Sequence, residues 1–253
     1  MKLSQAKNIV AASIDSQIQN ATGRDAQRVI PYLIGGAGLG KTSVIQQIAE
    51  ERDHGCYILS LAQFDAAELG GIIALVDGDA KRIMPHWLAK ITDMASNMEA
   101  VYLFLDELPQ APVSNQNVAA QIVNERRIGE FKLPDNCAIV AAGNRTSDRA
   151  GTNITPSHLR DRLMHLEVEA DLEDTIAYFM AHGVHEDVTG FNRSRPEFLH
   201  KFDRDANASP SPRSWDRVST ILGWGLPPVE QAEAITGQVG RAACADFMGY
   251  VKL

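Results

Sequence analysis

The sequence predicts an α/β protein, in which a parallel five-stranded sheet has helices on both faces and is followed by a small helical domain. Continuous apolar runs indicate strands buried on both faces, as in parallel sheets. A glycine-rich segment joins the first of these runs to a helical pattern, and after Glu169 the spacing becomes mainly helical. We therefore predict an α/β domain over residues 1–167 and a helical lid domain over residues 168–253.

The individual elements follow from apolar spacing and from the turn residues between them. The predicted strands cover residues 28–34, 56–61, 101–105, 138–142 and 163–168. A helix over residues 41–52 follows the first strand, and another begins near Pro85. Between them, residues 72–84 form two extended arms around a glycine-centred turn, which predicts a β-hairpin. In the second domain, helical spacing covers residues 171–183, 196–202, 212–223 and 228–248.

Length, charge and cysteine content narrow the class of protein. The chain has 253 residues and a formal net charge of −8, from 24 basic and 32 acidic side chains. Its composition, 45% hydrophobic and 22% charged, argues against disordered and fibrous classes. Three scattered cysteines support neither disulfides nor a zinc site, and they favour a reducing, cytoplasmic compartment. No apolar run reaches the ~18 residues of a membrane span, so we expect no membrane contact. The acidic balance argues against a surface that coats phosphate backbones, and the absence of a specific base-reading motif ranks nucleic acid as a second-choice partner.

Residues 35–42 carry the strongest chemical signal, because they match the phosphate-binding pattern G-x-x-x-x-G-K-[ST]. Glycines let backbone N–H groups turn toward a phosphate, and the N-terminus of the following helix adds partial positive charge. Lys41 would reach the outer phosphates, and Thr42 would place its hydroxyl on Mg²⁺. The predicted nucleotide-binding residues are Gly35, Gly36, Ala37, Gly38, Leu39, Gly40, Lys41, Thr42 and Ser43.

Two further strands end in residues suited to nucleotide hydrolysis. The strand at 101–105 runs into Asp106 and Glu107, at the edge where ligands of open α/β sheets bind. Asp106 is the expected outer-shell ligand of Mg²⁺, and Glu107 would orient and deprotonate the attacking water. Asn144 follows the strand at 138–142 and would hydrogen-bond that water or the γ-phosphate. The alternative at each position is a polar residue that merely ends a strand and starts a turn.

The order of these motifs resembles that of the AAA+ ATPases, and within them the MoxR family, over nearly the whole chain. Residues 35–42 resemble the Walker A motif, residues 103–107 the Walker B motif and Asn144 the sensor 1 residue. Farther along, residues 156–163 resemble the region that carries the arginine finger, and residues 211–213 resemble sensor 2. The hairpin at 72–84 takes the place of the helix-2 insert that marks this clade.

The resemblance implies roles for three arginines. It implies that Arg160 or Arg162, of which we favour Arg162, enters the site of a neighbouring subunit. An arginine there would stabilise the charge that develops on the phosphate oxygens during phosphoryl transfer. The alternative is a surface ion pair with Asp161 or Glu167, which would contribute little to stability. Arg213 would reach the γ-phosphate in its own subunit, with solvation at the start of a helix as its alternative.

The resemblance also implies the activity and the partners. It implies a Mg²⁺-dependent ATP hydrolase that works as a homo-oligomeric ring, a hexamer, with ATP bound between the α/β domain and the lid. The expected output is chaperone-like remodelling of a protein client, commonly with a partner that bears a von Willebrand factor A domain. One alternative is a ring motor acting on DNA or RNA, supported by Lys81 and Arg82 on the hairpin. The other is a nucleotide-gated assembly module with negligible turnover.

Overall fold

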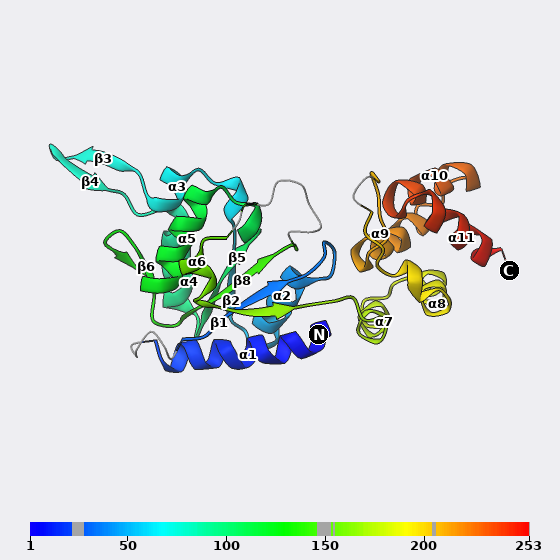
Figure 1. Ribbon diagram of the computed structural model, residues 1–253, viewed down its shortest axis with the longest axis horizontal. Helices are drawn as coiled ribbons and strands as arrows, with labels where there is room; N and C mark the ends of the chain where they lie inside the picture. Colours follow the sequence, from blue (N-terminus) through cyan, green and yellow to red (C-terminus); the bar gives the residue numbers. More distant parts are fainter. Residues whose placement is uncertain (22–27, 146–152, 154, 204–205, 253) are drawn as a thin grey trace. The chain divides into compact units, whose positions relative to one another are not determined.

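The computed structural model describes residues 1–21, 28–145, 153, 155–203 and 206–252, which form two compact units (Figure 1). The α/β unit comprises residues 5–34 and 41–167. The helical unit comprises residues 1–4, 35–40 and 168–253. The glycine-rich residues 35–40 therefore group with the helical unit, although both of their chain neighbours belong to the α/β unit.

The α/β unit is built on a five-stranded parallel sheet in the order β2-β5-β8-β1-β9. This confirms the predicted fold class and all five predicted strands, with small shifts at their ends. The central strand β8 is buried at every position, because strands flank it on both sides and its two faces are covered. The strands are β1 Ile30–Ile34, β2 Gly55–Ser60, β5 Val101–Asp106, β8 Cys137–Gly143 and β9 Leu163–Glu167.

Helices cover both faces of this sheet. On one face, alternate β5 residues such as Leu103 and Leu105 join a single core cluster with α4 (His86–Asn97) and α5 (Val113–Glu125). The intervening β5 residues point to the opposite face, where α1 (Leu3–Gln19) and α2 (Lys41–Glu51) bury apolar side chains outside that cluster. Both faces are therefore apolar, and polar side chains are left for the strand ends.

The N-terminal helix α1 is an element that the sequence pattern did not predict. Its buried stripe includes Ser13 and Gln17, two polar residues that obscure the apolar period. The Gln17 carboxamide donates from Nε2 to the Ile139 carbonyl (2.9 Å) and accepts from the Ile139 N–H (2.8 Å). The two bonds satisfy the backbone N–H and carbonyl of Ile139, which precedes Ala141, the first β8 residue paired with β1. They therefore fix α1 to the central strand of the sheet.

Two β-hairpins leave the body of the α/β unit. The predicted hairpin at 72–84 is confirmed as β3 (Ile73–Val76) and β4 (Asp79–Arg82), and Figure 1 shows it projecting beyond α3 (Ala66–Gly70). Its turn residues Asp77 and Gly78 have φ angles of 55° and 86°, as a two-residue turn between twisted strands requires. A shorter hairpin, β6 (Arg127–Ile128) and β7 (Phe131–Lys132), connects α5 to β8.

The described residues of the helical unit include five helices around an aromatic core. Phe191 lies at its centre, with ring centroids 5.1 Å from Trp215 and 5.4 Å from Phe247. Nowhere in the described ranges is a helix long and apolar enough to cross a membrane. The helices are α7 Leu172–Ala181, α8 Glu186–Ser194, α9 Pro212–Leu222, α10 Pro228–Val239 and α11 Arg241–Val251.

Two predictions for this unit were wrong in detail. Residues 196–202, expected to be helical, contain only a three-residue 3-10 turn, Pro196–Phe198. Helix α8 ends before this turn, because Pro196 has no backbone N–H to continue its hydrogen bonds. The helix expected over 228–248 is two helices, because Gly240 adopts a φ of 82° that breaks the chain direction between α10 and α11.

Candidate nucleotide-binding site

The glycine-rich loop takes a conformation that depends on its glycines. Gly38 and Gly40 have φ angles of 78° and 87°, and the chain enters α2 at Lys41. A Cβ on Gly35 would lie 2.6 Å from the Val168 carbonyl oxygen, and one on Gly38 would lie 2.6 Å from Ser211 Oγ. The loop therefore needs both backbone freedom and the absence of side chains, and it leads directly into the N-terminus of an 11-residue helix.

Lys41 and Thr42 bond to residues from two neighbouring strands. Lys41 Nζ donates to Asn144 Oδ1 at 3.0 Å, and the lysine is only 8% exposed. Thr42 Oγ1 donates to Asp106 Oδ2, also at 3.0 Å. Because β5, β8 and β1 run parallel, Asp106, Asn144 and the loop after β1 all lie at the carboxyl edge of the sheet. The structure thus brings together four of the residues predicted from separate motifs.

Glu107 lies at the same edge in a constrained backbone conformation. It has a φ of 58°, its N–H donates to Asp106 Oδ1 (2.8 Å), and its Oε2 accepts from Ser60 Oγ (2.9 Å). A left-handed conformation is costly for a non-glycine residue and is often found at functional sites. The Ser60 contact was not predicted. The pairing of β2 with β5, which sets Ser60 opposite Asp106, creates it.

The side-chain chemistry at this edge fits a magnesium ion better than a softer metal. Thr42 and Asp106 offer a hydroxyl and a carboxylate oxygen within 3.0 Å of each other, and Mg²⁺ prefers a few such oxygens with water and phosphate completing its shell. Among the residues that the structure describes, no group of three or more His, Cys, Asp or Glu side chains forms a site of its own. Burial raises the pKa of the Cys56 and Cys137 thiols to about 11, which keeps both protonated near neutral pH.

The two candidate finger arginines lie at the other edge of the sheet. Arg160 ends the short helix α6 (Ser157–Arg160), and Arg162 directly precedes β9, at the amino end of that strand. Both side chains are exposed. Within one chain the parallel sheet therefore separates these arginines from Asp106 and Glu107, which stand at the carboxyl ends.

Asn153 ties the segment before α6 to the turn that follows Glu107. Its backbone N–H donates to the Pro109 carbonyl and its Nδ2 to the Ala111 carbonyl, both at 2.9 Å. Pro109 belongs to the 3-10 turn Leu108–Gln110 that starts immediately after Glu107. Asn153 is thus a bridge between the arginine-bearing segment and the acidic strand end, and no motif in the sequence marked it.

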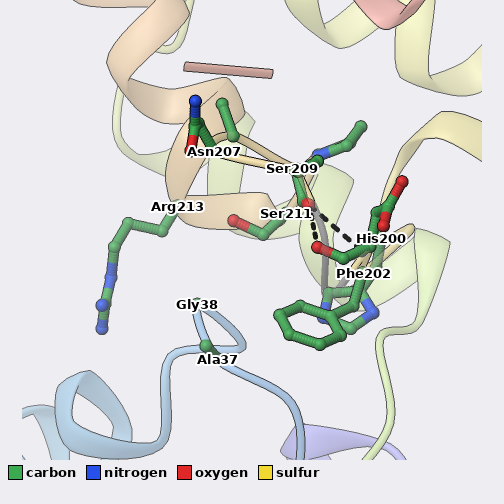
Figure 2. A pocket seen from close by; sticks show the side chains of 12 residues that line it. Ala37, Gly38, His200, Phe202, Asn207, Ser209, Ser211 and Arg213 are labelled. Carbon is green, nitrogen blue, oxygen red and sulfur yellow. Dashed lines mark hydrogen bonds between the residues drawn. The ribbon is translucent and has the colours of Figure 1, made fainter. Parts of the chain in front are cut away.

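Within the helical unit, the start of α9 bonds to the glycine-rich loop. Ser211 caps the helix in a reciprocal capping box with Ser214, and the Arg213 N–H donates to the Gly38 carbonyl at 3.3 Å. A cavity of about 230 Å³ adjoins this contact. Figure 2 shows His200 and Phe202 on one side of Gly38 and the extended Arg213 side chain on the other.

Comparison with known proteins is informative for the fold alone. No protein-family model and no curated protein matches the chain. Solved structures of Thermotoga maritima RuvB do match. A RuvB variant gives a TM-score of 0.52 at 14% identity, over 98% of this chain and 69% of that one. The RuvB Holliday junction branch migration motor gives 0.51 at 13% identity, with the same coverage. The fold is that of the AAA+ P-loop proteins. Within an AAA+ fold, the loop at 35–42 and the ends of β5 and β8 occupy the edge where parallel sheets bind ligands.

Proposed function

We propose that this chain is a Mg²⁺-dependent ATP hydrolase of the AAA+ class, similar to the MoxR family, that works as a homo-oligomeric ring. The proposal rests on two hydrogen bonds beside a glycine-rich loop, from Lys41 to Asn144 and from Thr42 to Asp106. The two partners are 103 positions apart in the sequence in the first bond and 64 in the second. A bound Mg²⁺ would neutralise phosphate charge next to the oxygens of Thr42 and Asp106.

The residues at this edge have distinct proposed tasks. Lys41 exchanges its bond to Asn144 for phosphate oxygens, which frees the Asn144 amide to hydrogen-bond the attacking water. Glu107 orients that water and accepts its proton as the water attacks the γ-phosphate. Before this step, the bond from Ser60 Oγ occupies one oxygen of the Glu107 carboxylate.

A ring would bring the distant arginines into use. Arg160 and Arg162 are exposed at the amino edge of the sheet, so one of them, Arg162 by our preference, would act in the site of the next subunit of a hexamer. Arg213 would act in its own subunit, where its backbone already bonds to the phosphate-binding loop. Each of the three would stabilise charge on the transferred phosphoryl group.

The proposed output is chaperone-like remodelling of a protein client in the cytoplasm, with a von Willebrand factor A-type partner. One of the RuvB structures is named as a Holliday junction branch migration motor. In this chain, the exposed Lys81 on the β3–β4 hairpin is the observation that favours a nucleic-acid role. Arg82, the other basic residue of that hairpin, bonds instead to the Gly70 and Gly71 carbonyls. We therefore rank nucleic acid second, and a module that binds nucleotide without turnover third.

A glutamine at position 107 tests the hydrolysis proposal. Glu107→Gln keeps the shape of the side chain but removes the base, so phosphate release from ATP should stop while ATP binding persists. The matched control is Glu99→Gln, an exposed glutamate just before the amino end of the same strand, which should leave turnover unchanged. Continued phosphate release by Glu107→Gln would contradict the assignment, and wild-type protein without turnover would favour the nucleotide-gated module.

A further inference from the structure

Large apolar side chains are exposed along the β3–β4 hairpin, which is an unusual position for them in a soluble protein. The side chains that we call the hairpin surface have exposed fractions between 37% and 80%, with Leu75 the highest. Such grouping of exposed apolar side chains marks a contact surface more often than scattered single ones do. The hairpin surface consists of Ile72, Ile73, Leu75, Ile83 and Met84.

The register of the hairpin places the two most exposed of these on one face. Ile73 lies opposite Arg82, and Leu75 lies opposite Ala80, so these four residues share one face. Asp79, which lies opposite Val76, is on the other face. The exposed fractions of Ile73 and Leu75, 63% and 80%, show that nothing in the described chain covers the face that they share. It is a narrow apolar stripe that a partner segment can reach from solvent.

Arg82 stabilises the base of the hairpin. Its Nη1 donates to the Gly70 carbonyl (2.9 Å) and the Gly71 carbonyl (3.1 Å), and its Nε lies 3.9 Å from Glu130 Oε2 in the turn between β6 and β7. The guanidinium therefore joins the end of α3 to the second hairpin. It holds the apolar stripe at a fixed place on the α/β unit.

The charges around the hairpin surface disfavour a phosphate backbone. Residues 61–84 carry four acidic side chains and two basic ones, and one of those two is Arg82. Asp77 and Asp79 are exposed at the tip, where Lys81 is the other exposed charge. Carboxylates at this position would repel nucleic acid and attract the cationic side chains of a polypeptide.

We propose that the hairpin surface binds an extended polypeptide segment whose apolar side chains are flanked by Lys or Arg. Ile73 and Leu75 would pack against the apolar side chains. Asp77 in the turn, and Asp79 on the other face beside the turn, would pair with flanking cations that reach the tip. The inference rests on the proposed function only for the role of ATP, and it deepens that function by stating the chemistry of the client.

Binding of labelled probes to the full chain, followed by fluorescence anisotropy with and without ATP, tests the inference. The probes are two short fluorescein-labelled peptides with one shared Val-Leu-Ile core, flanked either by lysines or by glutamates, and a labelled oligonucleotide. The test variant is Ile73→Ser combined with Leu75→Ser, both at exposed positions. Val229→Ser is the matched control, because Val229 is 76% exposed on α10 and belongs to the other unit.

The expected result is binding of the lysine-flanked peptide that weakens about tenfold or more in the double serine variant and stays unchanged in Val229→Ser. The glutamate-flanked peptide should bind several-fold more weakly, and Asp77→Asn with Asp79→Asn should remove this preference. Asparagine tolerates the positive φ at position 77, so the turn persists.

Three outcomes would overturn the inference, and two of them are seen in the variants. One is equal peptide binding by the wild type and the double serine variant. The other is preferential binding of the oligonucleotide that is lost in Lys81→Ala. ATP turnover is measured in the same samples. A chain that binds the lysine-flanked peptide through Ile73 and Leu75 but releases no phosphate would refute the proposed function and leave the hairpin surface standing. A chain that hydrolyses ATP but binds neither peptide would refute the inference about the hairpin surface and leave the proposed function standing.

Discussion

In each unit taken by itself, the residues predicted to bind nucleotide are held by a different kind of hydrogen bond. In the α/β unit, side chains bond to side chains, as Lys41 does to Asn144 and Thr42 to Asp106. In the helical unit, the backbone holds the loop, through the bond from the Arg213 N–H to the Gly38 carbonyl. Side-chain bonds can be exchanged for phosphate or water ligands while the sheet stays in place. The backbone bond instead joins the loop directly to the first turn of α9.

Among the changes predicted here, removing Lys41, one of the side chains that bond to each other in the α/β unit, should have the largest effect on ATP binding. Lys41→Ala deletes a charge-assisted donor, and such bonds contribute about 1.5–3 kcal/mol, so ATP affinity should fall between about tenfold and a hundredfold. Isothermal titration with ATP measures this, with Lys90→Ala on the exposed side of α4 as the control for lost charge. Unchanged affinity in Lys41→Ala would remove the basis for the phosphate site.

A methyl group at Gly38 should break the backbone contact of the helical unit. Gly38→Ala puts a Cβ 2.6 Å from Ser211 Oγ at a φ of 78°, so both backbone strain and a steric clash result. Gly183→Ala is the matched control, because its φ is 67° but nothing lies within 4 Å of its Cβ position. The shared strain costs about 1–2 kcal/mol, and Gly38→Ala should cost more than that in denaturant unfolding. Equal losses would show that the loop and Ser211 do not press on each other.

A change at Ser60 tests another side-chain bond of the α/β unit, with a smaller expected effect. Ser60→Ala removes the hydrogen bond that restrains one oxygen of Glu107 and so frees the carboxylate to turn toward the attacking water. We therefore expect kcat to rise by about two- to tenfold with little change in KM. Ser60→Thr keeps the hydroxyl and should behave as wild type. Steady-state phosphate release measures both variants. A fall in kcat for Ser60→Ala would mean that Ser60 positions Glu107 productively instead of restraining it.

The smallest expected effect concerns acid stability in the helical unit. The Asp174 N–H and then Lys2 lower the pKa of Asp171, the N-cap of α7, below its usual 3.8. Because the folded pKa lies below the unfolded value, this stability is present above about pH 4 and is lost as the pH falls through the folded pKa. Asp171→Asn should therefore unfold at a lower temperature than wild type at neutral pH, and the difference should shrink in acid. A pH-independent difference would exclude this carboxylate as its source.

The comparison also shows which features the sequence could reveal. Buried strands and the glycine-rich loop were predicted, because each is a local signal in consecutive residues, such as the apolar run at 138–142. Helix α1 was missed, because Gln17 faces the sheet and bonds to Ile139, which makes a polar residue part of the core. The break between α10 and α11 was also missed. Gly240 has a positive φ there, but a glycine in a helical pattern does not by itself show that the helix ends.

By itself, the sequence determined which residues are candidates for the nucleotide chemistry and the order in which they occur. Lys41, Asp106, Glu107 and Asn144 follow short motifs whose meaning depends on neighbours in the chain. The tertiary structure alone decided that Ser60 bonds to Glu107, that Asn153 bridges to the turn after it, and that Arg82 serves the hairpin base. These contacts join residues far apart in sequence, and only the pairing of strands and the course of loops bring their polar atoms within hydrogen-bonding distance.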